Sequence, residues 1–278
     1  LIGRAVNEIL PPIGLAFWRW MIALPIFLVL AWPHLKRDIG PALRHWPVMV
    51  LLALMSVTLY NTFIYIGLGS TEAINSMLIN TSRPSMIVVM TYFLFRERIS
   101  AVQALGLVLG LSGTTIIVLR GNFDFLGRVD LNQGDFWILG GTVSWAFYTV
   151  FLNKRPAIHA TSFMAIIVMI GLVFLAPLYL WEAFYVEPMP LVPETFWAVG
   201  YLGIVASALA FFGFNRAVML LGANRVGMMA YLSPVIGSAG AILLLGEQFH
   251  AYHGVGIAVI LLGVYLGSKK PAMGKEAQ

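Results

Sequence analysis

Apolar runs of about 18 to 23 residues, separated by short polar segments, follow one another along the chain, and each is long enough to cross a ~30 Å hydrocarbon core as an α-helix. The pattern predicts nine complete membrane-spanning helices, at residues 13–33, 46–68, 73–95, 101–119, 135–153, 160–181, 195–217, 224–245 and 251–268. Residues 1–10 resemble the end of a further span. Because the chain starts on Leu rather than Met, we expect part of that first helix to be missing.

Composition supports a membrane protein. The 278 residues are 60% apolar and only 10% charged, whereas a soluble domain carries about a quarter charged residues. The sequence contains no P-loop, dinucleotide fingerprint, zincin His pair or G-x-S-x-G elbow. We therefore expect neither an enzyme nor a cofactor.

The basic residues indicate topology rather than a nucleic-acid partner. If the first span leaves the cytoplasm, the outer side holds only Arg120 and Arg128. The cytoplasmic segments then hold Lys36, Arg37, Arg44, Arg96, Arg98, Lys154, Arg155, Arg216, Arg225, Lys269, Lys270 and Lys275. This positive-inside bias predicts that both termini are cytoplasmic.

An internal repeat relates residues 73–113 to 223–263 at a constant offset of 150. The shared residues include Pro84 and Pro234, and a Glu follows each proline by thirteen positions. The matching pairs are Ala73/Ala223, Pro84/Pro234, Leu94/Leu244, Glu97/Glu247, Ala101/Ala251, Gly106/Gly256, Leu111/Leu261 and Gly113/Gly263.

Charge flanking the repeated Glu predicts that the two halves are inverted. Glu97 lies between Arg96 and Arg98, whereas both neighbours of Glu247 are uncharged, as expected if one copy ends inside and the other outside. The fold class is therefore predicted as an all-α polytopic membrane protein, with ten transmembrane helices in two inverted five-helix repeats. The Gly106/Gly110/Gly113 and Gly256/Gly263 series favours close helix packing over a functional role.

Inverted repeats place substrate sites near the midplane, where interrupted helices meet. Pro84 and Pro234 predict these interruptions, because proline leaves the carbonyls of Asn80 and Ala230 without a helical partner. Such carbonyls could accept a substrate ammonium group. Alternatively, the prolines only kink their helices, and neighbouring hydroxyl side chains satisfy the carbonyls. Those side chains would be Thr81, Ser82 and Ser233.

Arg83 lies deep in its span, where an isolated charge costs at least ~2.5–3.5 kcal/mol. It is predicted either to clamp a substrate carboxylate or to act as a structural cation bound by freed carbonyls. Polar aromatic positions at helical spacing complete the candidate lining, and Trp145, about ten residues into its helix, is too deep for an interfacial anchor. The predicted substrate-binding residues are Tyr60, Asn61, Asn80, Arg83, Trp145, Tyr148, Phe211, Tyr231 and Ser233.

Coupling to protons would require a carboxylate in mid-membrane. Most Glu residues near the spans, including Glu182, lie at span ends, and Glu8 is the exception, with Arg4 one turn before it and Arg19 as a second nearby cation. Facilitated movement is therefore favoured over proton antiport. Glu247, His250 and His253 recur every three residues without one clear continuous helix, and no metal site is predicted.

With these motifs, the chain resembles the EamA-type branch of the drug/metabolite transporter superfamily. The resemblance rests on GTVSWAFYTVFLNK (141–154) and on the two repeats ending FRERISAVQALGLVLGLSG and LGEQFHAYHGVGIAVILLG. Among members, the chain is most similar to bacterial YddG-type aromatic amino-acid exporters.

The resemblance implies alternating access, with Trp145 as a cavity residue and Pro84 and Pro234 as bending points. Gly237 and Gly240 are candidate hinges, although close packing explains them equally well. The implied domains are a first repeat (1–119), an outer linker (120–134), a second repeat (135–268) and a cytoplasmic tail (269–278).

The sequence thus predicts a multi-pass protein of the bacterial inner membrane that exports aromatic or other neutral amino acids and related metabolites. Its expected partners are a small-molecule substrate and the lipid bilayer, and a monomer is compatible with the pattern. Two alternatives stay open: proton antiport of cationic aromatic drugs, and transport of nucleotide sugars.

Overall fold

The computed structural model describes residues 10–124, 131–190, 192–245 and 248–269, and all regular elements in these ranges are helices. The chain forms two compact units. The first comprises Leu1–Glu72 and Asn132–Leu220, and the second comprises Ala73–Leu131 and Leu221–Gln278. The expected first span, at residues 1–10, lies almost entirely outside the described residues.

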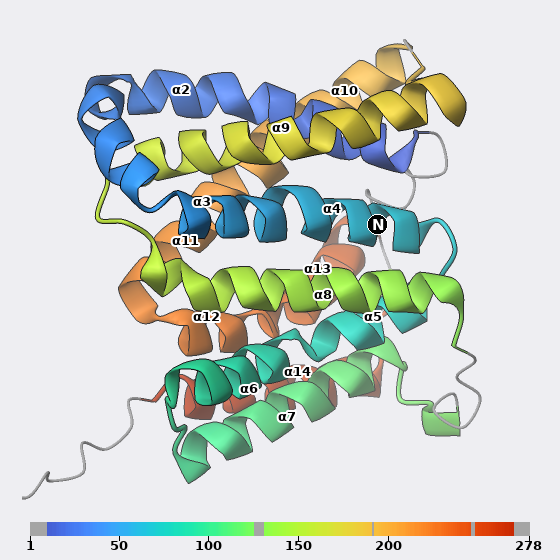
Figure 1. Ribbon diagram of the computed structural model, residues 1–278. Helices are drawn as coiled ribbons and strands as arrows, with labels where there is room; N and C mark the ends of the chain where they lie inside the picture. The colour runs from blue at the N-terminus through green and yellow to red at the C-terminus, as the bar shows by residue number, and fades with distance from the viewer. Residues whose placement is uncertain (1–9, 125–130, 191, 246–247, 270–278) are drawn as a thin grey trace, which may run out of the picture. The chain divides into compact units, whose positions relative to one another are not determined.

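In the first unit, α2 and α9 lie side by side, as do α4 and α8 (Figure 1). Its elements are α2 (Pro12–Arg44), α3 (Trp46–Ala53), η1 (Leu54–Leu59), α4 (Tyr60–Leu68), α8 (Gln133–Phe151), η3 (Leu152–Lys154), α9 (Ala160–Tyr185), α10 (Pro193–Tyr201), η4 (Leu202–Leu209) and α11 (Ala210–Leu221). Both η1 and η4 are π-helical turns inside longer helices.

In the second unit, α7 packs along α14. Its elements are α5 (Ala73–Thr81), α6 (Arg83–Phe95), α7 (Ala101–Val118), α12 (Ala223–Met229), α13 (Leu232–Leu245) and α14 (Ala251–Gly267). The buried core of this unit consists of Val88, Ile117, Met228, Tyr231 and Ile260.

All nine predicted spans coincide with helices in the described residues. In the described part of the chain, six helical stretches are long and apolar enough to cross a membrane: Pro12–Arg44, Trp46–Leu68, Ala101–Val118, Ala160–Tyr185, Pro193–Leu221 and Ala223–Leu243. The main difference is that α2 continues past the predicted end at residue 33, through Pro33 and Pro41, to Arg44. The polar residues after Pro33 mark the end of the apolar segment that fits the hydrocarbon core, but the helix itself continues through them.

The glycine series brings α7 and α14 into backbone contact. A Cβ atom on Gly106 would lie 2.6 Å from the carbonyl oxygen of Gly263, and one on Gly263 would lie 2.5 Å from the amide nitrogen of Gly110. Real Cβ contacts are not this short, so only glycine fits these positions. The packing interpretation of the series is confirmed.

Two buried carboxylates join α2 and α9 at opposite ends. The Glu182 carboxylate, near the end of α9, accepts hydrogen bonds from the Ile13 and Gly14 amides (3.0 and 2.6 Å) at the start of α2. Asp38, in the last third of α2, accepts one from the His159 amide (3.0 Å) at the start of α9. Carboxylates suit helix N-termini, where amide groups lack partners.

Structural landmarks also recur at the offset of 150. The π-helical turn η1 at residues 54–59 corresponds to 204–209, which lies within η4. The break between α5 and α6 at Ser82 likewise corresponds to position 232, next to the break between α12 and α13. The repeat therefore extends to local irregularities of the backbone as well as to shared residues.

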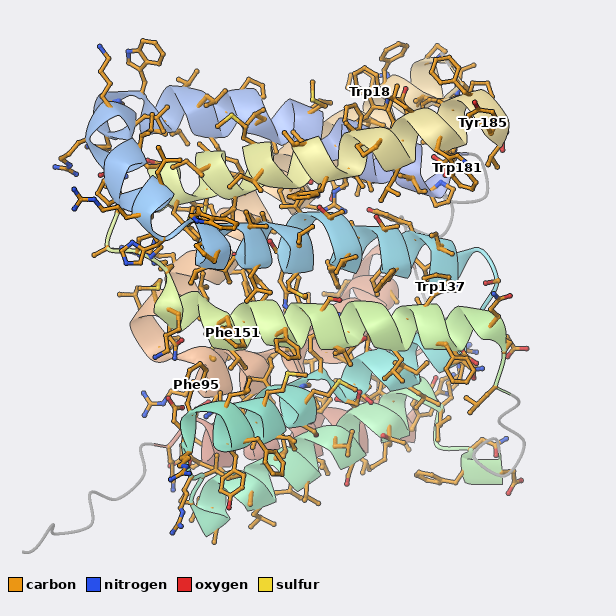
Figure 2. The ribbon with its side chains drawn as sticks, in the orientation of Figure 1. Trp18, Phe95, Trp137, Phe151, Trp181 and Tyr185 are labelled. Carbon is orange, nitrogen blue, oxygen red and sulfur yellow. The ribbon has the colours of Figure 1, made fainter. Side chains whose placement is uncertain are left out.

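Large aromatic side chains gather at one end of the α2–α9 pair, where Figure 2 labels Trp18, Trp181 and Tyr185. Their exposed fractions are 39%, 56% and 80%. Trp and Tyr with one apolar and one polar end are typical of the membrane–water boundary. This end of the pair therefore suits an interfacial position.

Candidate functional site

Four of the predicted substrate-binding residues form one aromatic cluster in the first unit. The Trp145 ring of α8 lies 4.5 Å from Tyr60 and 5.5 Å from Tyr148, measured between ring centroids. Phe211 of α11 stacks on Tyr148 at 5.7 Å. Tyr148 and Phe211 are buried, whereas Tyr60 and Trp145 are only partly buried. The buried rings thus support two rings that have accessible surface.

Two aromatic residues outside the predicted set extend this cluster. Trp20 of α2 meets Phe211 edge-on with centroids 5.1 Å apart, and Phe214 lies 4.9 Å from Trp145. Aromatic pairs at 4.5–7 Å contribute stability beyond the area that they bury. The cluster therefore connects α2, α4, α8 and α11.

A buried hydrogen-bond chain fixes Tyr148. Its hydroxyl donates to the Asn215 Oδ1 atom, and the Asn215 Nδ2 atom donates to the Phe211 carbonyl at 2.8 Å. All three residues are buried. This chain holds the ring of Tyr148 in position behind Trp145.

Asn61 is bound to the backbone of its own helix. Its Nδ2 atom donates to the carbonyls of Ser56 and Val57, both at 2.9 Å, and the residue is 2% exposed. These carbonyls belong to the π-helical turn η1. The amide group thus supports the turn that precedes Tyr60, and its predicted contact with substrate stays a prediction.

Arg19 of α2 is the cation that lies beside the aromatic cluster. Its Nε atom donates to the Ser207 hydroxyl (2.7 Å), and its Nη1 atom donates to the Tyr65 hydroxyl (2.5 Å). Its Cζ atom lies 5.4 Å from the centroid of the Trp20 ring. Both of these hydrogen-bond partners of Arg19 are neutral hydroxyl groups.

The sequence indicated Arg19 as a cation near Glu8 and did not place it among the predicted substrate-binding residues; Glu8 and Arg4 lie outside the described residues. The partners of Arg19 are 46 and 188 positions away along the chain. A local signal did exist, because an arginine seven residues into a long apolar helix needs a polar environment.

In the second unit, Asn80 and Arg83 contact each other across the break between α5 and α6. An Arg83 Nη2 group donates to Asn80 Oδ1, and Asn80 Nδ2 donates to the Ser76 carbonyl at 2.9 Å. The Ser82 hydroxyl donates to the Ile79 carbonyl at 2.6 Å. As predicted, the helix is interrupted near Pro84, which becomes the second residue of α6.

The prediction that the Ala230 carbonyl is bare was wrong. The Ser233 amide donates to it at 3.1 Å, because the chain tightens into a turn between α12 and α13. Tyr231 is 1% exposed and belongs to the core of the second unit, where its ring packs against Gly110. Ser233 is exposed. The roles of Tyr231 and Ser233 in binding stay predictions.

Gly237 and Gly240 on α13 differ from the glycines of α7 and α14. A Cβ atom at either position would meet no heavy atom of the described residues within 4 Å. Close packing within the described chain therefore does not explain them, and their role as hinges with Pro84 and Pro234 stays a prediction.

The candidate metal motif has a structural role at two of its three positions. The His253 Nδ1 atom accepts a hydrogen bond from the His250 amide at 3.1 Å, which caps the start of α14. Glu247 lies outside the described residues. Among the residues that the structure describes, no group of three potential ligands is arranged to hold a metal ion.

Comparison with known proteins indicates the class of this chain. The EamA-like transporter family matches residues 1–119 and 132–268. An uncharacterized transporter of Archaeoglobus fulgidus is 31% identical over 94% of this chain and 89% of its own length.

Two further relatives widen the range of organisms. The uncharacterized transporter YetK of Bacillus subtilis is 26% identical over 96% of this chain and 81% of its own. The chloroplastic WAT1-related protein At3g02690 of Arabidopsis thaliana is 26% identical over 94% and 64%. A crystal structure with 19% identity covers 95% of this chain and 89% of its own, with a TM-score of 0.75, which shows a shared fold.

Proposed function

We propose a cargo for this chain, which belongs to the EamA-like transporter family and is thus a membrane transporter and not an enzyme. The proposed cargo is aromatic and other neutral amino acids, which the chain exports. Related metabolites with a flat apolar group belong to the same substrate class. Transport follows alternating access, without a cofactor.

The observation that carries this proposal is the aromatic cluster with a cation beside it in the first unit. Tyr60 and Trp145 offer accessible ring surface to a flat side chain. Ser207, which binds the Arg19 guanidinium, lies one turn before Phe211 of the cluster. A zwitterionic amino acid with an aromatic side chain presents the matching groups.

Arg19 is suited to bind the substrate carboxylate. A guanidinium has five N–H donors, and the bonds to Ser207 and Tyr65 use two of them. Those bonds fix its orientation, so little side-chain entropy is lost when an anion binds. Arg83 in the second unit is the competing candidate, and it contacts Asn80.

The buried acids favour facilitated exchange over proton antiport. Glu182 and Asp38 bind amides at helix N-termini. Asp135 binds the Asn132 amide at the start of α8. In the described part of the chain, each of these buried acids thus accepts backbone hydrogen bonds at the start of a helix.

Helix pairing supports the proposed inverted repeats. The offset of 150 relates α2 to α9, η1 to η4 and α7 to α14. The contact of α2 with η4 therefore has the contact of α9 with η1 as its counterpart, and in the α2–α9 and α7–α14 pairs a helix packs against its own repeat copy. A twofold relation between halves produces this pattern. The proposed repeats are 1–119 and 135–268, joined by the outer linker 120–134, with both termini and the tail 269–278 on the cytoplasmic side of a bacterial inner membrane.

The test is counterflow of labelled phenylalanine and tryptophan into liposomes that contain the purified chain, with and without a pH gradient. Trp145→Ala should reduce exchange by about 2- to 10-fold, because stacking on this ring orients the substrate. The matched control is Trp32→Ala, since Trp32 is 75% exposed on α2 and should be neutral.

Two further variants decide which arginine binds the carboxylate. Arg19→Gln should weaken exchange by about 10- to 100-fold, the range expected for one charged hydrogen-bonding group, whereas Arg83→Gln should have a smaller effect. The reverse order would assign the carboxylate to Arg83. If no amino acid is exchanged, the proposed cargo is wrong, and dependence on the pH gradient would refute facilitated exchange.

A further inference from the structure

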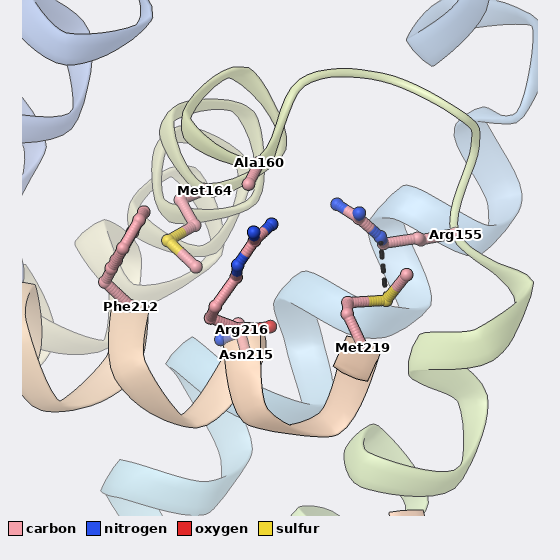
Figure 3. A pocket seen from close by; sticks show the side chains of 7 residues that line it. All are labelled: Arg155, Ala160, Met164, Phe212, Asn215, Arg216 and Met219. Atoms are coloured by element: carbon pink, nitrogen blue, oxygen red, sulfur yellow. Dashed lines mark hydrogen bonds between the residues drawn. The ribbon is translucent and has the colours of Figure 1, made fainter. Parts of the chain in front are cut away.

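A second polar site in the first unit lies between the start of α9, α11 and the segment that follows η3, and it borders Asn215, which holds Tyr148 of the aromatic cluster. Figure 3 shows Arg155 and Arg216 entering this pocket from different elements. The cavity has a volume of about 20 Å³, which is enough for one water-sized group such as a single oxyanion oxygen. Its lining residues are Arg155, Ala160, Met164, Phe212, Asn215, Arg216 and Met219.

Neither arginine of this pocket has a carboxylate within 4 Å among the described residues. The Nε atom of Arg155 donates instead to the Met219 sulfur at 3.1 Å, and a thioether is a weak acceptor. The Arg155 Cζ atom also lies 5.3 Å from the centroid of the Phe163 ring. Burial, together with the like charge of Arg216, lowers the pKa of Arg155.

The remaining wall is apolar or already hydrogen-bonded. Asn215 uses its side-chain oxygen for the Tyr148 hydroxyl and its nitrogen for the Phe211 carbonyl. Phe212 and Met219 are 37% and 44% exposed, so the apolar wall reaches the outer surface of the described chain. Two guanidinium groups next to an exposed apolar surface match an anion that carries a long apolar group.

We propose that Arg155 and Arg216 form a binding site for a phosphate oxyanion, supplied either by an anionic phospholipid headgroup or by free phosphate. Guanidinium groups bind phosphate with two parallel hydrogen bonds. Basic pockets between transmembrane helices on the cytoplasmic side suit phospholipid headgroups. The site is independent of the proposed cargo, because it uses neither Trp145 nor Arg19.

The experiment compares two sources of phosphate on the purified full chain. In the first arm, the chain is placed in nanodiscs of phosphatidylcholine with or without phosphatidylglycerol, and retained lipid is counted by native mass spectrometry. In the second arm, inorganic phosphate is added to the chain in detergent and the unfolding temperature is measured. Unfolding temperatures in the absence of ligand confirm that each variant is folded.

Three variants test the site. Arg155→Gln with Arg216→Gln should reduce phosphatidylglycerol retention by about 30-fold, given the usual contribution of two basic residues near the membrane surface. Arg155→Lys with Arg216→Lys keeps the charge and the topology signal but loses the paired geometry, so it should give an intermediate loss. Arg44→Gln with Arg98→Gln removes the same charge elsewhere and should retain lipid.

The outcomes separate the two sources. Loss of phosphatidylglycerol only in the Arg155/Arg216 variants supports a headgroup site. If inorganic phosphate stabilises the wild type but not the double Gln variant, and the wild type retains no phosphatidylglycerol, the site binds a free anion. The proposal is overturned if neither probe binds, or if the Arg44/Arg98 control loses as much lipid as the Arg155/Arg216 variant.

Discussion

The hydroxyl of Tyr148 is a single group on which the aromatic cluster depends. Tyr148→Phe would leave the buried Asn215 oxygen without this donor, and such a loss costs about 1–3 kcal/mol. We expect a lower unfolding temperature in detergent. Tyr185→Phe is the control, because Tyr185 is 80% exposed. Equal unfolding temperatures for the two variants would show that the buried bond contributes nothing.

At the residue scale, the sequence identifies positions by depth and helical spacing. The positions of Tyr60 and Trp145 along their predicted spans were sufficient to assign both to one substrate-binding site, and the structure places their ring centroids 4.5 Å apart. The orientation of Arg19 could not be predicted in this way, because Ser207 lies 188 positions later. Contacts between distant helices depend on how those helices pack, which local periodicity does not contain.

Asn61 shows a second limit of residue-scale inference. A polar amide in an apolar span indicates a partner, but it does not say whether that partner is a ligand or the backbone. Here the partners include two carbonyls of η1. The π-helical turn itself was not predicted, because Leu54–Leu59 lies inside one continuous predicted span.

At the scale of elements, hydropathy predicted helix positions well because each span must separately match the thickness of the bilayer. The predicted span 101–119 agrees with α7 to one residue. The end of α2 was missed by eleven residues, between residue 33 and Arg44, because the polar residues after Pro33 continue the helix.

The α7–α14 interface gives a prediction at this scale. Gly106→Val would push apart backbones that are in contact, and overpacking of this kind costs about 1–3 kcal/mol or more. The unfolding temperature should fall.

The control is Gly213→Ala on α11, where an added Cβ atom meets nothing within 4 Å. A helical glycine replaced by alanine in open space should leave stability unchanged or raise it by about 0.4–1 kcal/mol. If Gly106→Val matched this control, close packing would not be the reason for glycine at position 106.

At the scale of the whole molecule, the proposed topology can be tested because the chain contains no cysteine. Single cysteines at Leu131, in the proposed outer linker, and at Ala157, on the proposed cytoplasmic side, occupy exposed positions. In intact cells, a membrane-impermeant maleimide should label Leu131→Cys and should label Ala157→Cys only after permeabilisation. The opposite pattern would reverse the orientation.

The reciprocal bonds of Glu182 and Asp38 have a mechanical consequence for α2 and α9. A helix pair that is tied at one end can still pivot about that end, whereas ties at both ends oppose pivoting as well as sliding. The two helices are then expected to move as one rigid unit. If transport proceeds by the proposed alternating access, we expect the rearrangement at the borders of α2 and α9 with other helices, and the contact between α2 and α9 should be kept.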